Sequence, residues 1–367
     1  MTNALLTVRS SGCIVPEGIE KVLIRGTNWI GDVVMSLPAV SSVRHTFPGA
    51  RIVILAKPWV ADLYRACPDI DDIIVFQSPG VHDGMRGKVR LAEELREERF
   101  DLVLLLQNAI EAALIAWRAG IPLRAGYNSD CRGFLLTHSV QRTSEIRRVH
   151  QIDYYLEMVR ALGFATMGRE VHITPDDDTC GIAQTILAGH GIHKGDTLIG
   201  VAPGASYGPA KMWFPERFAA VADRLIDEVS AKVILFGSVG DRERTKRVQE
   251  HAAHSLIDLA GETSLKEAIA LIAKCNLFIS NDSGLMHLAG ALGVSLVAIF
   301  GSTNPVTTSP AGERSIVIHR DVPCSPCLKK ECPTDFKCMD LIQVDDVYDA
   351  AKGLLKRDVG SGSMPKE

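Results

Sequence analysis

Near its amino end the chain reads Leu23-Ile-Arg-Gly26-Thr-Asn-Trp-Ile-Gly31-Asp32, a short apolar run that leads into a loop with two glycines. A segment with helical periodicity follows, from Asp32 to about His45. A strand, a glycine-containing loop and a helix N-terminus in this order are typical of a parallel α/β sheet, and such a loop suits an anionic or hydroxylated ligand. The stretch is neither a G-x-G-x-x-G fingerprint nor a P-loop, because the Lys-Ser/Thr pair is missing.

The same alternation continues along the chain. A helix is predicted over 88–98, and another starts at Leu265, where Ser264 and Glu267 have the spacing of a capping box. Gly293 suits the left-handed position that ends a helix. Strand-length apolar runs lie at 22–25, 52–56, 73–76, 102–107 and near 124–127, and again at 198–202, 232–237, 256–259, 277–280 and 296–300.

The length of 367 residues exceeds what one hydrophobic core usually supports. The polar, proline-containing segment 174–178 is predicted to be the linker between two domains. We therefore expect an α/β protein of two tandem Rossmann-like domains facing a cleft, residues 1–175 and 176–367, the second with a cysteine-rich loop at 324–338. Ligands bind at the carboxyl ends of the strands in such sheets.

Composition limits the function classes. Apolar residues make up 46% and charged residues 23%, as in ordinary soluble proteins, and the net charge of −4 argues against a general nucleic-acid binder. No apolar run approaches the ~20 residues that span a bilayer. The N-terminus does not resemble a signal peptide, so a cytoplasmic protein is expected. The tail from Gly360 is rich in Gly, Ser and Lys and is expected to be frayed.

Asp32 has two interpretations. A carboxylate at the mouth of a cleft can be a general base, and the helix N-terminus would lower its pKa. The simpler interpretation is that Asp32 only caps the helix.

A second motif is Val201-Ala-Pro-Gly204-Ala-Ser206-Tyr-Gly208-Pro-Ala-Lys211-Met-Trp213-Phe-Pro215. The glycines allow a ligand to approach the backbone, Ser206 offers a hydroxyl and Lys211 a positive charge, which together would suit a diphosphate. The alternative is a flexible surface loop with an incidental lysine.

A third motif is Ile279-Ser-Asn-Asp282-Ser283-Gly284-Leu-Met-His287, at the end of a strand. Ser283 and Gly284 offer backbone N–H groups at a helix start, where phosphate binds well, and His287 lies one turn further on. The alternatives are N-capping for Asp282 or Ser283 and a core position for His287.

Two further groups of residues are ambiguous. The cluster Cys324, Cys327, Cys332 and Cys338 could hold zinc, but zinc ribbons usually separate two Cys-x₂-Cys pairs by a longer loop. We expect a metal-free structural loop that lies away from the strand ends assigned to ligand. Arginines gather late in the first half and form either a solvated face or a site for a phosphorylated acceptor; with His150 they are Arg142, Arg147 and Arg148, and Arg124 and Arg132 lie upstream.

In this order the three glycine-bearing motifs resemble the ADP-heptose:lipopolysaccharide heptosyltransferases, glycosyltransferase family 9, over roughly residues 21 to 345. The Gly-Pro-Ala-Lys211 segment and the late cysteines are most similar to the type II branch. The resemblance implies a GT-B fold and inverting transfer of heptose from ADP-L-glycero-D-manno-heptose to the first heptose of the lipopolysaccharide inner core, on Kdo–lipid A. One departure is the segment Trp213-Phe214-Pro215, which holds one extra residue and puts the geometry of that loop in doubt.

The resemblance also implies roles for single residues. Asp32 would be the general base. Arg124 and Arg132 would contact the acceptor. Donor contacts would come from Ser206 and Lys211 at the diphosphate, Glu243 near the ribose, Thr263 at the adenine, and Asp282, Ser283, Gly284 and His287 around phosphates and sugar. Since a lysine and helix N-termini can stabilise a departing ADP, we expect no required cofactor and no protein-bound metal, with stimulation by a divalent cation left open.

The expected partners are ADP-heptose and a lipid A–Kdo–heptose acceptor at the membrane surface, without nucleic acid and without a transmembrane segment. A peripheral position on the inner face of the inner membrane is left open. Three other functions remain: a heptosyltransferase of type I or III or with another acceptor, a nicotinamide-dependent oxidoreductase, and a non-enzymatic nucleotide-sensing or zinc-stabilised scaffold. The missing G-x-G-x-x-G fingerprint counts against the oxidoreductase.

Overall fold

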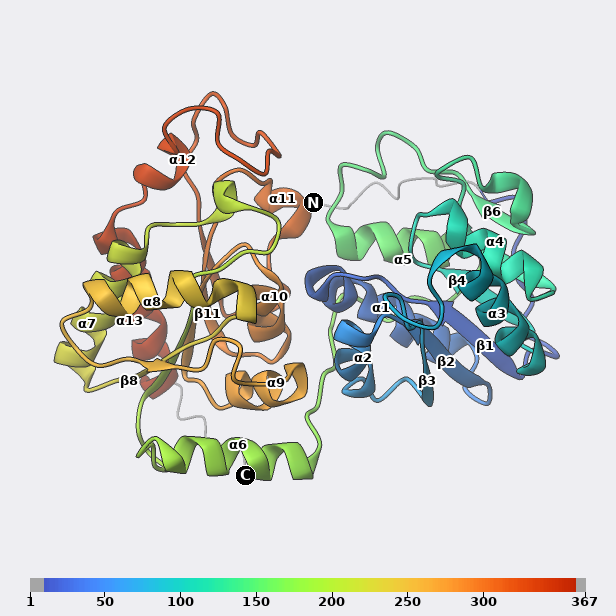
Figure 1. Cartoon of the computed structure of the whole chain (residues 1–367). Helices are drawn as coiled ribbons and strands as arrows, with labels where there is room; N and C mark the ends of the chain where they lie inside the picture. The colour runs from blue at the N-terminus through green and yellow to red at the C-terminus, as the bar shows by residue number, and fades with distance from the viewer. Residues whose placement is uncertain (1–9, 361–367) are drawn as a thin grey trace. The chain divides into compact units, whose positions relative to one another are not determined.

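The computed structural model describes residues 10–360, so the predictions about a signal peptide and about the tail beyond Gly360 concern residues outside the described part. The chain divides between Thr174 and Pro175 into two compact units, which we call unit 1 and unit 2. The boundary lies inside the predicted linker segment. Each unit is an α/β domain with one sheet (Figure 1).

Unit 1 contains a six-stranded sheet in the order β3-β2-β1-β4-β5-β6, and every strand pairing is parallel. Helices α1 and α5 pack together, and so do α3 and α4 (Figure 1). The elements are β1 (Lys21–Arg25), α1 (Ile30–Thr46), β2 (Arg51–Ala56), α2 (Pro58–Arg65), β3 (Asp72–Val75), α3 (Gly84–Glu97), β4 (Leu102–Leu105), α4 (Ile110–Arg118), β5 (Leu123–Tyr127), the 3₁₀ turn η1 (Gly133–Leu135), β6 (His138–Val140) and α5 (Gln151–Ala161).

Unit 2 repeats this topology, because its order β12-β11-β10-β7-β8-β9 is the unit 1 order read from the other edge. Its elements are α6 (Asp177–Gly189), β7 (Leu198–Ala202), η2 (Pro209–Lys211), α7 (Pro215–Val229), β8 (Lys232–Leu235), η3 (Val239–Asp241), α8 (Arg242–His251), β9 (Ile257–Asp258), α9 (Leu265–Ala273), β10 (Leu277–Asn281), α10 (Gly284–Ala291), β11 (Ser295–Ile299), α11 (Pro305–Thr308), β12 (Ser315–Ile318), α12 (Lys337–Asp340) and α13 (Val344–Gly360).

The strands are apolar throughout because helices cover both faces of each sheet. Along β7, Ile199 and Val201 face a core shared with α7, α8 and α13, whereas Leu198 and Ala202 face the core beneath α6 and α9. The predicted tandem Rossmann-like architecture is therefore confirmed in each unit.

Most predicted strands are present to within two residues, and the capping box at Ser264 and the left-handed Gly293, with φ 69°, are observed. The edge strands β6 and β12 were not predicted from the sequence. Both are short and only partly buried, so they lack the apolar run that announces a central strand. Within the described residues, no helix combines the length and the hydropathy needed to cross a bilayer.

Candidate functional site

In unit 2 the chain leaves β7 toward one edge of the sheet and returns at β10 to build the other edge. The strand order therefore reverses between β7 and β10, and open α/β sheets bind ligands at the carboxyl side of such a point. Two of the predicted ligand segments start there. Residues 203–211 follow β7, and Asp282 follows β10 directly.

Lys211 and Asp282 form an ion pair at this point. The Lys211 Nζ lies 2.6 Å from Asp282 Oδ2, with side-chain exposures of 15% and 4%. Thr303, in the loop after β11, donates its hydroxyl to the same carboxylate oxygen at 2.6 Å. Because the lysine offsets the charge of Asp282, this carboxylate does not have to repel a diphosphate, and Lys211 keeps further N–H donors for a ligand.

A second layer of hydrogen bonds fixes the backbone beneath this pair. The Asn281 side chain accepts a bond from Trp213 N at 2.9 Å and donates to Pro203 O at 2.7 Å. Arg244 donates to Pro203 O at 2.8 Å and to Trp213 O, and burial lowers the pKa of its guanidinium to about 10. The segment with the extra residue is therefore anchored, since Trp213 is fully buried and Pro215 begins α7.

Helix α10 begins two residues after Asp282. Ser283 is its N-cap and accepts a bond from Met286 N at 3.3 Å, so the capping alternative holds for Ser283 and not for Asp282. Gly284 is the first helical residue, and His287 is buried at 3% exposure one turn further on. Backbone N–H groups at this helix start provide positive potential beside Lys211.

The remaining predicted donor residues lie in loops or in the first turn of a helix, at the same carboxyl edge of the sheet. Ser206 is exposed in the loop after β7. Glu243 lies in the first turn of α8, after β8, and its carboxylate is 3.5 Å from the Arg247 guanidinium. Thr263 is half-buried between β9 and the cap of α9. The topology thus gathers these residues at one edge, and their roles toward a ligand stay predictions.

The cysteine-rich loop does not lie away from the ligand-bearing segments, so this part of the prediction is wrong. The Tyr207 hydroxyl donates to Leu328 O at 2.8 Å, and Ala210 N donates to Lys330 O at 3.0 Å. Gly208 has φ 154°, and a Cβ there would lie 2.5 Å from Lys330 O. The loop was misplaced because it follows the last strand in sequence yet folds back over the segment that follows β7.

The four cysteines of this loop are near neighbours but are not bound to one another. Burial raises the pKa of the Cys338 thiol, and the charges of Cys324, Cys332 and Cys327 raise it further. Among residues 10–360, no three His, Cys, Asp or Glu side chains are arranged to hold a metal ion. A metal-free loop stays a prediction, which elemental analysis of protein purified without added metal would test.

In unit 1 the strand order reverses between β1 and β4, and Asp32 lies beside this point in the first turn of α1. The N-cap residue is Trp29, not Asp32. Gly26 is required here because a Cβ would lie 2.5 Å from the Tyr64 hydroxyl, which accepts a bond from Thr27 N at 2.9 Å. Burial raises the pKa of Tyr155 on α5, and the nearby charge of Asp32 raises it further.

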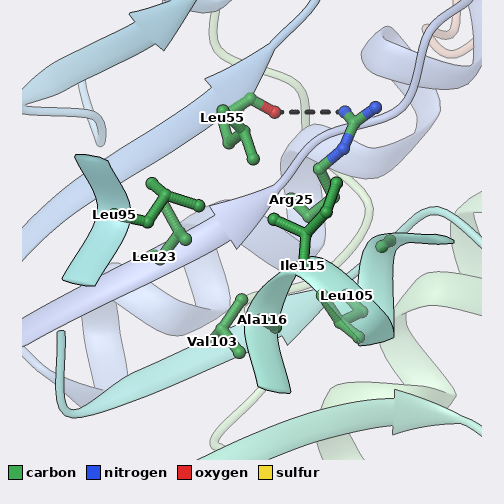
Figure 2. A pocket seen from close by; sticks show the side chains of 9 residues that line it. Leu23, Arg25, Leu55, Leu95, Val103, Leu105, Ile115 and Ala116 are labelled. Atoms are coloured by element: carbon green, nitrogen blue, oxygen red, sulfur yellow. Dashed lines mark hydrogen bonds between the residues drawn. The ribbon is translucent and has the colours of Figure 1, made fainter. Parts of the chain in front are cut away.

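Two buried cations lie near the same edge and were missed by the sequence analysis. Arg25 donates to Gly26 O at 2.6 Å and to Leu55 O at 3.2 Å, and burial lowers its pKa to about 10. Figure 2 shows its guanidinium reaching Leu55 beside a cavity of about 10 Å³, which is room for one water at most. Lys57 lies 3.7 Å above the Phe76 ring, and burial followed by the charge of Arg25 lowers its pKa.

The two arginines predicted to contact the acceptor have internal partners instead. Arg132 has 0% exposure, and its guanidinium donates to the carbonyls of Leu105, Gln107, Ala109 and Tyr127. Arg124 donates to Leu135 O at 2.7 Å and Ile121 O at 2.6 Å. Both guanidinium groups thus hold the chain around β5, and a role in acceptor binding stays a prediction.

The later arginines are more accessible. Arg147 and Arg148 are exposed, and Arg142 lies 5.7 Å from the centre of the Tyr154 ring. His150 caps α5, where its Nδ1 accepts a bond from Ile152 N at 3.1 Å.

Some residues of the site have sequence features from which a ligand contact could have been predicted. Thr303 lies in the polar run Gly301-Ser-Thr-Asn304, which starts two residues after the end of β11, and a polar run near a strand end is itself a ligand signal. Asn281 belongs to a motif that was recognised, but its bonds to Trp213 and Pro203 join segments far apart in sequence. Arg25 looks like an ordinary strand residue, so its burial could not be foreseen.

Comparison with known proteins agrees with this geometry. Residues 88–337 match glycosyltransferase family 9 (heptosyltransferase). Lipopolysaccharide heptosyltransferase 2 of Escherichia coli K12 is 31% identical over 314 residues, 81% of this chain and 87% of that protein. Proteins named lipopolysaccharide heptosyltransferase 1, from Pseudomonas aeruginosa, and 3, from E. coli, match at 25% and 24% identity.

Solved structures give the same result for the fold. The glycosyl transferase family 9 protein from Veillonella parvula aligns with a TM-score of 0.83 at 26% identity, over 94% of this chain and 99% of that one. ADP-heptose lipopolysaccharide heptosyltransferase II of E. coli aligns with a TM-score of 0.77 at 27% identity, over 92% and 99%. The predicted GT-B fold is confirmed.

Proposed function

This chain belongs to glycosyltransferase family 9, the heptosyltransferases, and from that premise we propose that it transfers heptose from ADP-L-glycero-D-manno-heptose to the first heptose of the lipopolysaccharide inner core, carried on Kdo–lipid A. The observation that carries the proposal is the Lys211–Asp282 pair at the strand reversal of unit 2, beside the start of α10. A lysine and a helix N-terminus together suit the diphosphate of a nucleotide sugar.

The proposed chemistry is an inverting displacement. As the acceptor hydroxyl attacks the anomeric carbon, Asp32 takes its proton, and the bond to the ADP oxygen breaks on the opposite side. Lys211 and the N–H groups of α10 stabilise the negative charge that develops on the leaving diphosphate. These groups supply the stabilisation without an obligatory cofactor, and a divalent cation would be an addition to them.

The type II acceptor is proposed because lipopolysaccharide heptosyltransferase 2 of E. coli matches at 31% identity, whereas the relatives named heptosyltransferase 1 and 3 match at 25% and 24%. The test is mass spectrometry of reactions that contain ADP-heptose and lipid A-core acceptors truncated at each step. We expect one added heptose on the acceptor that ends in a single heptose. Addition only to the acceptor that ends in Kdo would indicate a type I enzyme, and addition only to longer cores a type III enzyme.

A further inference from the structure

Helix α4 presents few polar side chains to solvent. Its nine residues, Ile110–Arg118, include only two charged side chains, Glu111 and Arg118. Both are paired with α3: Glu111 lies 2.5 Å from Lys88, and Arg118 lies 3.6 Å from Glu93. Both charges of α4 therefore lie on the side that faces α3, where their side chains are 40% and 47% exposed.

The outer surface of α4 is apolar. Ile110, Leu114 and Trp117 have the i, i+4, i+7 spacing of a single helix face, and 36%, 45% and 56% of their surface is exposed. The opposite face packs into the core of unit 1 through Ala112, Ala113, Ile115 and Ala116. A contiguous exposed apolar patch often marks an interaction site, so the outer face is expected to be covered when the protein works.

Phe134 extends this surface. It lies on η1, which packs against α4, and it is 78% exposed. The residue before η1, Arg132, donates to Ala109 O at 3.3 Å, directly before the first residue of α4. We call Ile110, Leu114, Trp117 and Phe134 the α4 surface.

We propose that the α4 surface docks on a membrane that carries anionic lipid headgroups. Of the six arginines in residues 110–150, Arg124 and Arg132 donate to backbone carbonyls and Arg118 is paired with Glu93, so the charge that supports this occupant comes from the other three. Arg142, Arg147 and Arg148 are exposed within that segment. Tryptophan and phenylalanine are suited to the boundary between headgroups and acyl chains.

The area of the surface also favours a membrane over a second copy of the chain. Its four side chains offer on the order of 500 Å², whereas a stable protein interface needs about 800 Å² per partner. Interfacial membrane binding needs only modest apolar insertion together with electrostatic attraction. The choice of a lipid rests on the proposed function in one respect: the proposed acceptor is itself anchored by lipid A.

The test is cosedimentation of the full chain with vesicles of phosphatidylethanolamine and phosphatidylglycerol, and with vesicles of phosphatidylcholine alone. The variant Leu114→Ser/Trp117→Ser removes the centre of the surface, and Leu114→Met/Trp117→Phe preserves its apolar character. Ile182→Ser/Leu341→Ser is the matched control, because these unit 2 residues are 39% and 43% exposed. Trp117→Ser alone replaces the double variant if the latter does not fold.

We expect binding to the anionic vesicles, weakened by salt, and at least a ~10-fold loss in the serine variant. The Met/Phe variant and the unit 2 control should bind like the unchanged chain. The proposal is overturned by absent binding of the unchanged chain, by equal binding of the serine variant, or by a dimer in ultracentrifugation that the serine variant abolishes. Turnover of a detergent-dispersed acceptor is a separate measurement, so its absence would count against the proposed function and leave the vesicle result intact.

Discussion

Units 1 and 2 share one strand order, but the points where that order reverses are built differently. In unit 2, Lys211 and Thr303 each donate a hydrogen bond to the same oxygen of Asp282 at 2.6 Å. In unit 1, Asp32 follows a loop that ends in Trp29, which is 62% exposed. One topology thus supports an ion-paired lysine in unit 2 and, in unit 1, a carboxylate in the first helical turn after an exposed tryptophan.

The difference fits the two tasks of the proposed reaction. Stabilising a leaving diphosphate requires a positive charge that is already oriented, because reorganising it during the reaction would cost free energy. A general base must instead come within hydrogen-bond reach of a hydroxyl on a large acceptor, and such contacts often tighten only when the substrate binds.

The largest expected effect concerns Asp32 in unit 1. Replacing Asp32 with Asn should lower kcat by ~10²–10⁴-fold, the usual contribution of a general base. The ADP affinity measured by calorimetry should stay unchanged, since the donor contacts are proposed in unit 2. A folded, nearly fully active Asp32→Asn enzyme would remove Asp32 from the mechanism and leave it a first-turn acid that stabilises α1.

Arg132 tests whether unit 1 uses its buried cations for structure. Arg132→Gln leaves several buried carbonyls without their donor and should lower the free energy of unfolding by on the order of 2–4 kcal/mol. Arg142→Gln is the control, because that side chain is exposed. If Arg132→Gln instead left the melting temperature unchanged and raised KM for the acceptor, the predicted contact with the acceptor would be supported.

The two units also differ in how much of the site could be predicted from the sequence. In unit 2, Lys211 and Asp282 lie in motifs with glycines and a strand end, so the segments could be recognised from local pattern. Their direct pairing could not, because 71 residues separate them and only the neighbouring positions of β7 and β10 bring them together. In unit 1, Arg124 and Arg132 were predicted from a cluster of arginines and from the family resemblance, and neither distinguishes a ligand contact from a guanidinium that binds backbone carbonyls.

Substitution of Lys211 tests whether the ion-paired lysine of unit 2 binds the donor. Lys211→Ala should weaken ADP binding by roughly 10- to 100-fold, because a charge-assisted bond in a partly desolvated site contributes about 1.5–3 kcal/mol. Lys330→Ala is a control, since Lys330 lies near the same Tyr207 ring but is not paired with Asp282. Unchanged ADP affinity in Lys211→Ala would exclude the lysine from the donor site. Asp282→Ala should impair donor use more than ADP binding, because Lys211 remains but loses its orientation.

Substitutions at Thr303 test whether the orientation of the Asp282–Lys211 pair matters separately from the charge of the lysine. Thr303→Val removes one bond to Asp282 and keeps the size of the side chain, so ADP binding should weaken by roughly 3- to 10-fold. Thr303→Ser retains the hydroxyl and should restore the affinity. A double-mutant cycle with Lys211→Ala should show that Thr303→Val has little further effect once the lysine is gone. Fully additive effects would mean that Thr303 acts independently of the pair.

The smallest expected effect concerns the contact between the donor segment and the cysteine-rich loop, a layer that only unit 2 has among the described residues. Tyr207→Phe removes the hydroxyl that donates to Leu328 O, while the ring remains beside Lys211 and Lys330. The bond is exposed and neutral, so its loss should weaken ADP binding only about 2- to 5-fold, corresponding to roughly 0.5–1 kcal/mol. Calorimetry at fixed salt measures this, with Tyr348→Phe on α13 as a control for removing a tyrosine hydroxyl elsewhere in the unit.

A loss as large as that of Lys211→Ala would mean that the loop sets the position of the cation, and the fixed geometry of unit 2 would then depend on the cysteine-rich loop and not on Asp282. No change in affinity would mean that the ion pair with Asp282 suffices to hold Lys211, which is the stronger form of the contrast between the two units.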